Sequence, residues 1–260
     1  AFYENEDTGV YFSFDYEQPI IDKENTELFS GNARISFNLN TFRPHIFALE
    51  AEPEVARFIK IFSLSIHDPQ INGNKSAKYN SADFIRGWNA SNIFSYKAIK
   101  VDPEVKPFTL QGDDIERYWV WNYSRSKLQK EIGEDIFVPV ITFILIRGVV
   151  KSYVVWCDAL PTVFPDVDMV IIYRDELAPS KLFSLKKKAD FSLSLLNYSE
   201  IKHLFSDITT TNNQIRYRGY NPNSEQNAKT KKWITSLKAM QTKPVAVPAD
   251  QILDEELNSN

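Results

Sequence analysis

Residues 141–156, Ile-Thr-Phe-Ile-Leu-Ile-Arg-Gly-Val-Val-Lys-Ser-Tyr-Val-Val-Trp, decide the fold class of this chain. Two runs rich in β-branched side chains, 141–146 and 149–156, flank the pair Arg147-Gly148. This arrangement is typical of a β-hairpin, and the apolar character of both runs places it at the centre of a sheet. We expect residues 168–173, Asp-Met-Val-Ile-Ile-Tyr, to form the neighbouring strand.

Outward from the hairpin, short apolar runs predict further strands, and helical patterns come late in the chain. The predicted strands are 10–16, 33–39, 58–66, 93–101 and 118–123, and the predicted helices are 199–205 and 224–240. We therefore expect an α+β, β-rich fold with a core of mostly antiparallel sheet or an open barrel. The main helices should lie in the C-terminal third.

The domain organisation is predicted from composition along the chain. Residues 1–243 show no strong boundary and should form a single globular unit, with 103–113 as the place for any subdivision. Residues 244–260 are polar and acidic and contain two prolines, so we expect a flexible acidic C-terminal tail.

Composition excludes several classes of protein. A chain of 260 residues that is 43% hydrophobic and 25% charged is typical of an ordered globular protein with a sizeable core. Only 8 glycines argue against glycine-rich phosphate loops. Because Cys157 is the one cysteine, no intramolecular disulfide can form, which favours a reducing, cytoplasmic location. Apolar runs such as 138–146 are too short to cross a membrane, so we expect no membrane association.

Charge is distributed unevenly along the chain. Residues 1–60 carry a net −6, residues 61–180 carry −2, residues 181–244 carry +8, and the remainder carries −4. The overall charge of −4 therefore hides a basic third that is followed by an acidic end.

Motifs for catalysis are sparse. His45, His67 and His203 occur in unrelated contexts without a nucleophile elbow, and one cysteine with three scattered histidines gives no zinc-ligand spacing. We expect no cofactor, no metal and no catalytic residues, which points away from an enzyme.

Two acidic patterns leave a metal-dependent alternative open. Asp166-Val167-Asp168 resembles the Asp-x-Asp of nucleotide-sugar transferases, although here the apolar strand follows the pair instead of preceding it. Pro165-Asp166 with Glu200-x-Lys202 resembles the Pro-Asp…Glu-x-Lys pattern of restriction-type nucleases, in which the acids bind magnesium. That family places Glu-x-Lys on a strand, whereas 199–205 is predicted here as a helix.

Cations interleaved with aromatic rings form the remaining candidate site. Single-stranded nucleic acid is bound by cations that contact phosphates and by rings on which unpaired bases stack. The side chains of this kind are Arg216, Tyr217, Arg218, Tyr220, Lys229, Lys231, Lys232, Trp233, Trp119, Trp121, Arg125 and Lys127. Aromatic strands also fill protein cores, so the sequence leaves open whether Trp119 and Trp121 face inward or outward.

Three functional hypotheses follow, in this order. The first is a non-catalytic protein that binds nucleic acid, most plausibly single-stranded DNA, with the acidic tail competing for the cations. Its charge order resembles that of single-stranded-DNA-binding proteins with acidic tails. The second is a protein-interaction module, either an assembly component or an inhibitor of a basic partner, with the acidic tail as a contact for a protein partner. The third is a metal-dependent nuclease that uses Asp166.

Overall fold

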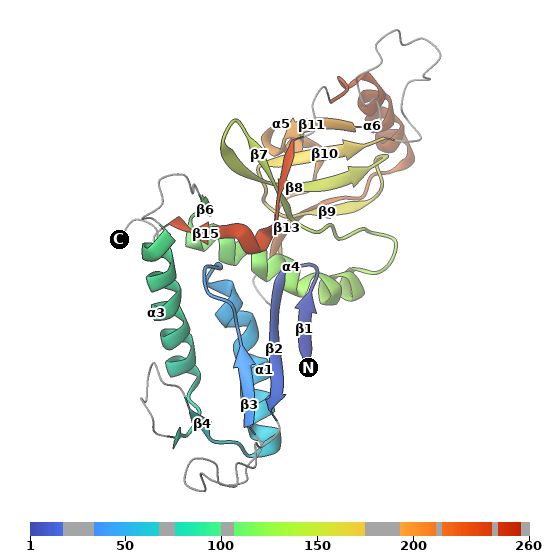
Figure 1. The fold of residues 1–260 in the computed structure, drawn as a ribbon. Helices are drawn as coiled ribbons and strands as arrows, with labels where there is room; N and C mark the ends of the chain where they lie inside the picture. Colours follow the sequence, from blue (N-terminus) through green and yellow to red (C-terminus); the bar gives the residue numbers. More distant parts are fainter. Residues whose placement is uncertain are drawn as a thin grey trace, which may run out of the picture. The chain divides into compact units, whose positions relative to one another are not determined.

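The chain forms two compact units. The computed structural model describes residues 1–17, 34–67, 76–99, 107–174, 193–211, 215–240 and 244–255 (Figure 1). Unit 1 comprises residues 1–115 and 250–260, and unit 2 comprises residues 116–249. The first boundary between them lies just beyond the stretch 103–113, where the sequence placed any subdivision.

Unit 1 is built on a three-stranded antiparallel sheet in the order β1-β2-β3. The strands are β1 (Phe2–Asn5), β2 (Val10–Glu17) and β3 (Arg34–Asn38). The expected strands 10–16 and 33–39 are thus confirmed. The helix α1 (Ile46–Phe62) runs alongside this sheet (Figure 1). Phe14 on β2 stacks on Phe58 of α1, with ring centroids 4.4 Å apart, so aromatic side chains pack between the sheet and this helix.

The helices of unit 1 lie where strands were predicted. Residues 58–62 end α1, and residues 93–99 belong to α3 (Ser81–Ile99). Both stretches are apolar enough to suggest buried strands, but the buried side chains of α3 recur at helical spacing, as Trp88, Asn92 and Tyr96 show. At the end of α1, Ile61 and Phe62 are 61% and 59% exposed, so this stretch is not a buried strand. The short pair β4 (Ile66–His67) and β5 (Ser76–Ala77) lies between the two helices in the chain.

A buried carboxylate ties the N-terminal strands to α1. Glu50 is 2% exposed and accepts hydrogen bonds from the Tyr3 hydroxyl, the Asn5 amide and the Thr8 hydroxyl, at 2.8 to 3.0 Å. Three donors replace the water that burial removes, which is the condition for keeping a carboxyl group in a core.

The predicted flexible tail is wrong for the residues that the structure describes. β14 (Val245–Val247) pairs antiparallel with β7, and β15 (Ile252–Asp254) pairs parallel with β6 (Phe108–Leu110). A 3-10 turn, η3 (Ala249–Gln251), joins them. Ile252 and Leu253 are apolar anchors, 2% and 1% exposed, that the acidic composition of this stretch conceals.

Unit 2 contains the predicted central hairpin. β7 (Thr142–Ile146) and β8 (Val149–Cys157) pair antiparallel across Arg147-Gly148, and both turn residues adopt positive φ. β10 (Met169–Tyr173) lies beside β8 in parallel, which confirms it as the neighbouring strand. With β11 (Leu193–Asn197) the five-stranded sheet has the order β11-β10-β8-β7-β14.

A second sheet and three helices complete unit 2. β12 (Thr209–Thr210), β13 (Arg216–Tyr220) and β9 (Thr162–Phe164) form a three-stranded sheet with β13 in the middle. The helices are α4 (Gly112–Ile132), α5 (Tyr198–Ile201), which continues into the 3-10 turn η2 (Lys202–Leu204), and α6 (Ser224–Ser236). The predicted helix 224–240 is confirmed as far as Ser236, and α5 with η2 covers most of 199–205.

The fold is mixed α+β with several antiparallel sheets, and no sheet of the described ranges closes into a barrel. The main helices do not lie in the C-terminal third, because α1, α3 and α4 span 17, 19 and 21 residues and α6 only 13. Among the described helices, none combines the length and the apolar character that crossing a membrane requires.

Candidate nucleic-acid interface

Residues 118–123 form part of helix α4, not a strand, and this changes which aromatic rings share a face. In a strand, Trp119 and Trp121 would point the same way, whereas a helix separates them by about 200°. Trp121 is 3% exposed and donates from Nε1 to the Pro139 carbonyl at 2.8 Å, so it belongs to the core. Trp121 is therefore removed from the candidate interface.

The same helical spacing brings Trp119 and Tyr123 together. Their ring centroids are 5.4 Å apart with planes 31° from parallel, and Tyr123 is 49% exposed. Lys127, one turn further on, continues this line and forms an exposed pair with Glu131 at 3.9 Å. We call Trp119, Tyr123 and Lys127 the α4 stripe. Arg125 is half-buried and, at six residues from Trp119, lies well off this line.

The predicted residues on strand β13 lie on opposite faces, because side chains alternate along a strand. Arg216, Arg218 and Tyr220 share one face, and Tyr217 lies on the other. Arg216 is exposed and forms no ion pair with the described residues, while Arg218 donates to the Ser206 carbonyl at 3.0 Å. Tyr217 is half-buried.

Tyr220 is a core residue, contrary to its predicted role in binding. It is 3% exposed, and its ring meets that of Trp156 edge-on at 4.8 Å, beside Phe164 and Phe205. Burial raises the pKa of its hydroxyl above the ordinary value. The face of β13 that carries Tyr220 therefore turns into the aromatic core of unit 2 at this end, and only its Arg216 end is exposed.

Helix α6 presents part of the predicted lysine cluster. Its N-terminus is fixed by a capping box between Asn223 and Gln226. Thr230 and Ile234 form its buried side, while Lys232 is exposed and Lys231 and Trp233 are half-buried. Lys229 is neutralised by Glu225 at 2.6 Å.

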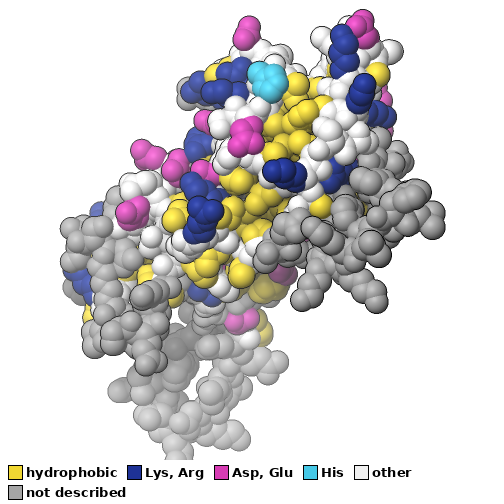
Figure 2. All heavy atoms as spheres, turned by 90° about the horizontal axis from the view of Figure 1, so that it is seen from above, with side chains coloured by type: hydrophobic (Ala, Val, Ile, Leu, Met, Phe, Trp, Pro, Cys, Tyr) yellow, Lys and Arg dark blue, Asp and Glu magenta, His cyan; other side chains and the backbone are white. Residues whose placement is uncertain are grey.

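On one face of the molecule the Lys and Arg side chains do not merge into a single basic area (Figure 2). On the face drawn in Figure 2 they occur singly or in small groups beside hydrophobic surface, with Asp and Glu side chains among them. The cations of this set that have no acidic partner in the described ranges are Arg216, Arg218, Lys231 and Lys232, of which Arg218 donates to a backbone carbonyl. The predicted residues thus lie on three elements of unit 2, the helix α4, the strand β13 and the helix α6.

The two acidic patterns do not assemble a metal site within the described residues. Asp168 is occupied by Lys151 at 3.0 Å and by the backbone and hydroxyl of Ser152, so it joins β8 to β10. Glu200 lies on the helix α5, as expected, and accepts from Asn197. Asp166 is exposed.

Cys157 has the surroundings of an unreactive thiol. It ends β8 and is half-buried, and burial together with the neighbouring Asp158 raises the pKa of its thiol. A raised pKa keeps the thiol protonated and therefore poorly nucleophilic at neutral pH.

The two units differ in sign of charge. Unit 1 contains 11 Lys and Arg against 21 Asp and Glu, a formal charge of −10, while unit 2 contains 19 against 13, a charge of +6. Together they make the overall −4. The charge counts along the sequence did not reveal this contrast, because the range 61–180 combines acidic parts of unit 1 with a basic part of unit 2.

Tyr123 is the residue of the candidate interface that sequence reasoning missed. The signal was present, since Trp119, Tyr123 and Lys127 are spaced by four, but it has meaning only if the segment is read as a helix. Comparisons with protein-family models, with curated proteins and with solved structures gave no match.

Proposed function

We propose that unit 2 binds single-stranded nucleic acid, with the α4 stripe as the stacking platform. The observation that carries this proposal is the Trp119–Tyr123 ring pair on α4, in which Tyr123 is 49% exposed, in a unit of net charge +6. Aromatic side chains that stay accessible, next to a cation, are the combination that unpaired bases and phosphates require.

The chemistry of each group follows from its exposure. An unpaired base presents a flat apolar face, and the half-exposed ring of Tyr123 offers a matching one. Lys127 is held only by a long, exposed ion pair with Glu131, which a phosphate can replace at little cost. Arg216, Lys231 and Lys232 add cations that no described acidic group neutralises.

Binding is tested with the full chain and a fluorescently labelled oligodeoxythymidine, by anisotropy at low salt. Replacing Trp119 and Tyr123 with Ala should weaken binding, because stacking contributes about 1–3 kcal/mol per base. Both rings are at least partly accessible, so the variant should keep its fold, which circular dichroism checks. The matched control is Phe94→Ala, which removes a 75% exposed ring from unit 1 and should leave affinity unchanged.

The electrostatic part is tested by varying salt. Substituting Lys231 and Lys232 with Ala should reduce the slope of log affinity against log salt by up to about 1.4 if both contact phosphates of a single strand. Lys60→Ala and Lys97→Ala in unit 1 form the control pair. Absence of binding at low salt, or equal losses in the ring variant and in Phe94→Ala, would overturn the proposal.

A protein-interaction module is the second candidate, and one observation favours it. The outer face of the β1–β3 sheet, with Glu4, Asp15 and the 66% exposed ring of Phe2, belongs to a unit of charge −10. A basic protein surface would complement it. Co-purification of a partner that survives nuclease treatment and is lost in a Glu4→Lys/Asp15→Lys variant would support this function instead.

A further inference from the structure

Unit 1 holds a short acidic segment of the chain in a defined site. The segment, residues 250–255, comes from the far end of the sequence and lies along β6, where Ile252 pairs with Phe108 and Asp254 with Leu110. Ile252 and Leu253 are almost fully buried. Residues 252–254 of the segment therefore bind as a short extended strand with two apolar anchors, and strand addition is a common way to recognise a peptide.

Two basic residues of one loop bind the two aspartates of the segment. Arg43 Nε lies 3.5 Å from Asp250 Oδ2. His45 binds both oxygens of Asp254, through its ring Nδ1 at 2.5 Å and its backbone N–H at 2.9 Å. The cationic loop thus matches aspartates that are spaced by four residues around an apolar pair.

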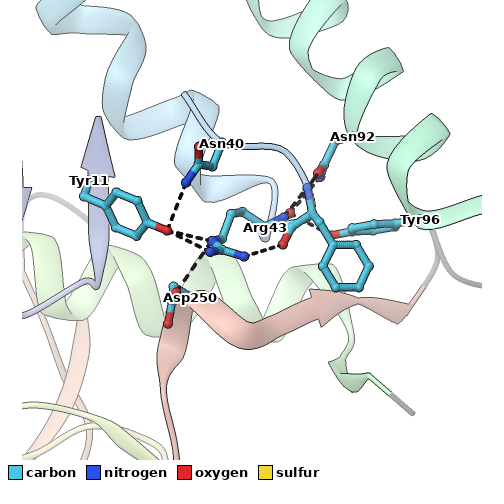
Figure 3. Close-up of polar contacts among 7 residues, drawn as sticks. Tyr11, Asn40, Arg43, Asn92, Tyr96 and Asp250 are labelled. Atoms are coloured by element: carbon cyan, nitrogen blue, oxygen red, sulfur yellow. Dashed lines mark hydrogen bonds and ion pairs between the residues drawn. The ribbon is translucent and has the colours of Figure 1, made fainter. Parts of the chain in front are cut away.

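The shape of this loop is fixed by contacts outside the segment. Phe42 adopts φ 61°, which is costly for a side chain of this size. The fully buried Asn92 holds it there, because its Oδ1 accepts from the backbone of Phe42 at 2.6 Å and its Nδ2 donates to the Arg43 carbonyl at 2.7 Å. Tyr96 donates to the same carbonyl, as Figure 3 shows.

The Arg43 guanidinium is oriented in the same way. It donates from Nη2 to the Tyr11 hydroxyl at 2.7 Å and from Nη1 to the Phe42 carbonyl at 2.9 Å (Figure 3). Asp250 is only one of its partners. The loop therefore has contacts of its own, with Tyr11, Asn92 and Tyr96, that do not involve the segment.

We propose that this site also accepts the acidic segment of a second copy of the chain, so that two copies exchange residues 250–255. The strand pairing, the ion pair and the hydrogen bonds described above join the segment to unit 1, whereas the β14 strand that precedes it belongs to unit 2. Pro248 is the one residue between β14 and η3. Its ring fixes its own φ and disfavours a helical conformation of Val247, which ends β14. Because the same contacts form within a chain and between chains, reciprocal exchange gives a closed dimer at low cost.

A disulfide across the site reports exchange directly. Gln111 and Glu255 continue the β6–β15 register by one residue, and their exposed side chains are hydrogen-bonded at 2.6 Å. Paired strands lie about 4.8 Å apart, within the range that a disulfide spans. Full-length chains carrying only Gln111→Cys are mixed with chains carrying only Glu255→Cys, unfolded, refolded together at high concentration, and oxidised.

The expected result is a covalent heterodimer in several-fold excess over a control mixture in which Glu200→Cys, on the exposed surface of unit 2, replaces Glu255→Cys. Adding Asp250→Arg to the Gln111→Cys chain weakens its own segment and should raise the yield further. Adding Arg43→Asp to that chain instead should lower it to the control level. A yield equal to the Glu200→Cys control in the unmodified mixture would overturn the proposal, whatever the charge variants do.

Discussion

Unit 1 and unit 2 differ both in charge and in how the chain closes them. Unit 2 is made from the continuous stretch 116–249 and is basic, while unit 1 is acidic and is completed by residues 250–255 from the far end of the chain. A near-neutral whole therefore contains two units of opposite sign. The comparison teaches that a functional hypothesis for this protein has to be assigned to one unit, because a polyanion and a basic protein would select different ones.

The buried charges of the two units also have opposite signs. Unit 1 buries Glu50, which is satisfied by three neutral donors, and unit 2 buries Arg174, which is 1% exposed. Arg174 donates from Nη1 to the carbonyls of Ile234 and Leu237, at 2.7 and 2.9 Å. These carbonyls end α6, so the guanidinium caps the negative end of the helix.

Removing an anchor of the acidic segment should produce the largest loss of stability. Leu253→Ala truncates a side chain that is 1% exposed, which costs about 2–5 kcal/mol in a core. The loss should fall on unit 1, and hydrogen exchange measured residue by residue should locate it there. Val245→Ala on the 64% exposed side chain of β14 is the control. Equal stability of the two variants would mean that the segment is loosely held, as the acidic composition first suggested.

This segment also shows where sequence reasoning stopped. Ile252 and Leu253 stand between acidic residues after a proline, a local pattern that is the same for a tail and for a docked strand. A docked strand differs from a free tail in having binding partners, and here these are Arg43 and His45, about two hundred residues earlier in the chain. No local sequence pattern indicates a contact between residues so far apart in the chain.

The hairpin could be predicted from the sequence, and the aromatic helix α4 could be predicted only in part. The hairpin 141–156 was predictable because its alternation, its turn glycine and its burial agree with one another. In α4 the helical period of Tyr118, Trp121 and Leu128 was hidden, because the residues between them include further aromatic rings that favour strands on propensity alone. The candidate site was therefore predicted in composition but not in geometry.

Cutting the cap of α6 should cost less than removing the anchor and should affect the other unit. Arg174→Met keeps the apolar stem and removes two charge-assisted bonds, for which we expect a loss of about 2 kcal/mol. Hydrogen exchange should increase in α6 and leave α1 and α3 unchanged. Arg57→Met, on the exposed surface of α1, is the matched control. An increase of exchange in unit 1 as large as that in α6 would contradict the assignment of this arginine to unit 2 alone.

The smallest expected effect concerns alkaline pH. Burial, followed by the nearby Asp166, raises the pKa of Tyr198 in unit 2 to about 12, and Arg218 acts in the opposite direction. In the unfolded chain this hydroxyl titrates near 10. Because the folded value is the higher one, the contribution of Tyr198 to stability is complete below pH 10 and is lost as the pH rises from 10 through 12. By pH 11 the loss is about 1 kcal/mol.

Tyr198→Phe should therefore make the stability of unit 2 less sensitive to pH between 10 and 12, as measured by urea unfolding at each pH. At pH 8 the stability of this variant should stay within the usual range for the loss of one hydroxyl. Unit 1 serves as the internal reference, since burial raises the pKa of Tyr79 and Tyr96 there and the substitution leaves both in place. An unaltered pH profile of unit 2 would show that the Tyr198 hydroxyl is more accessible to solvent than its 7% exposed side chain implies.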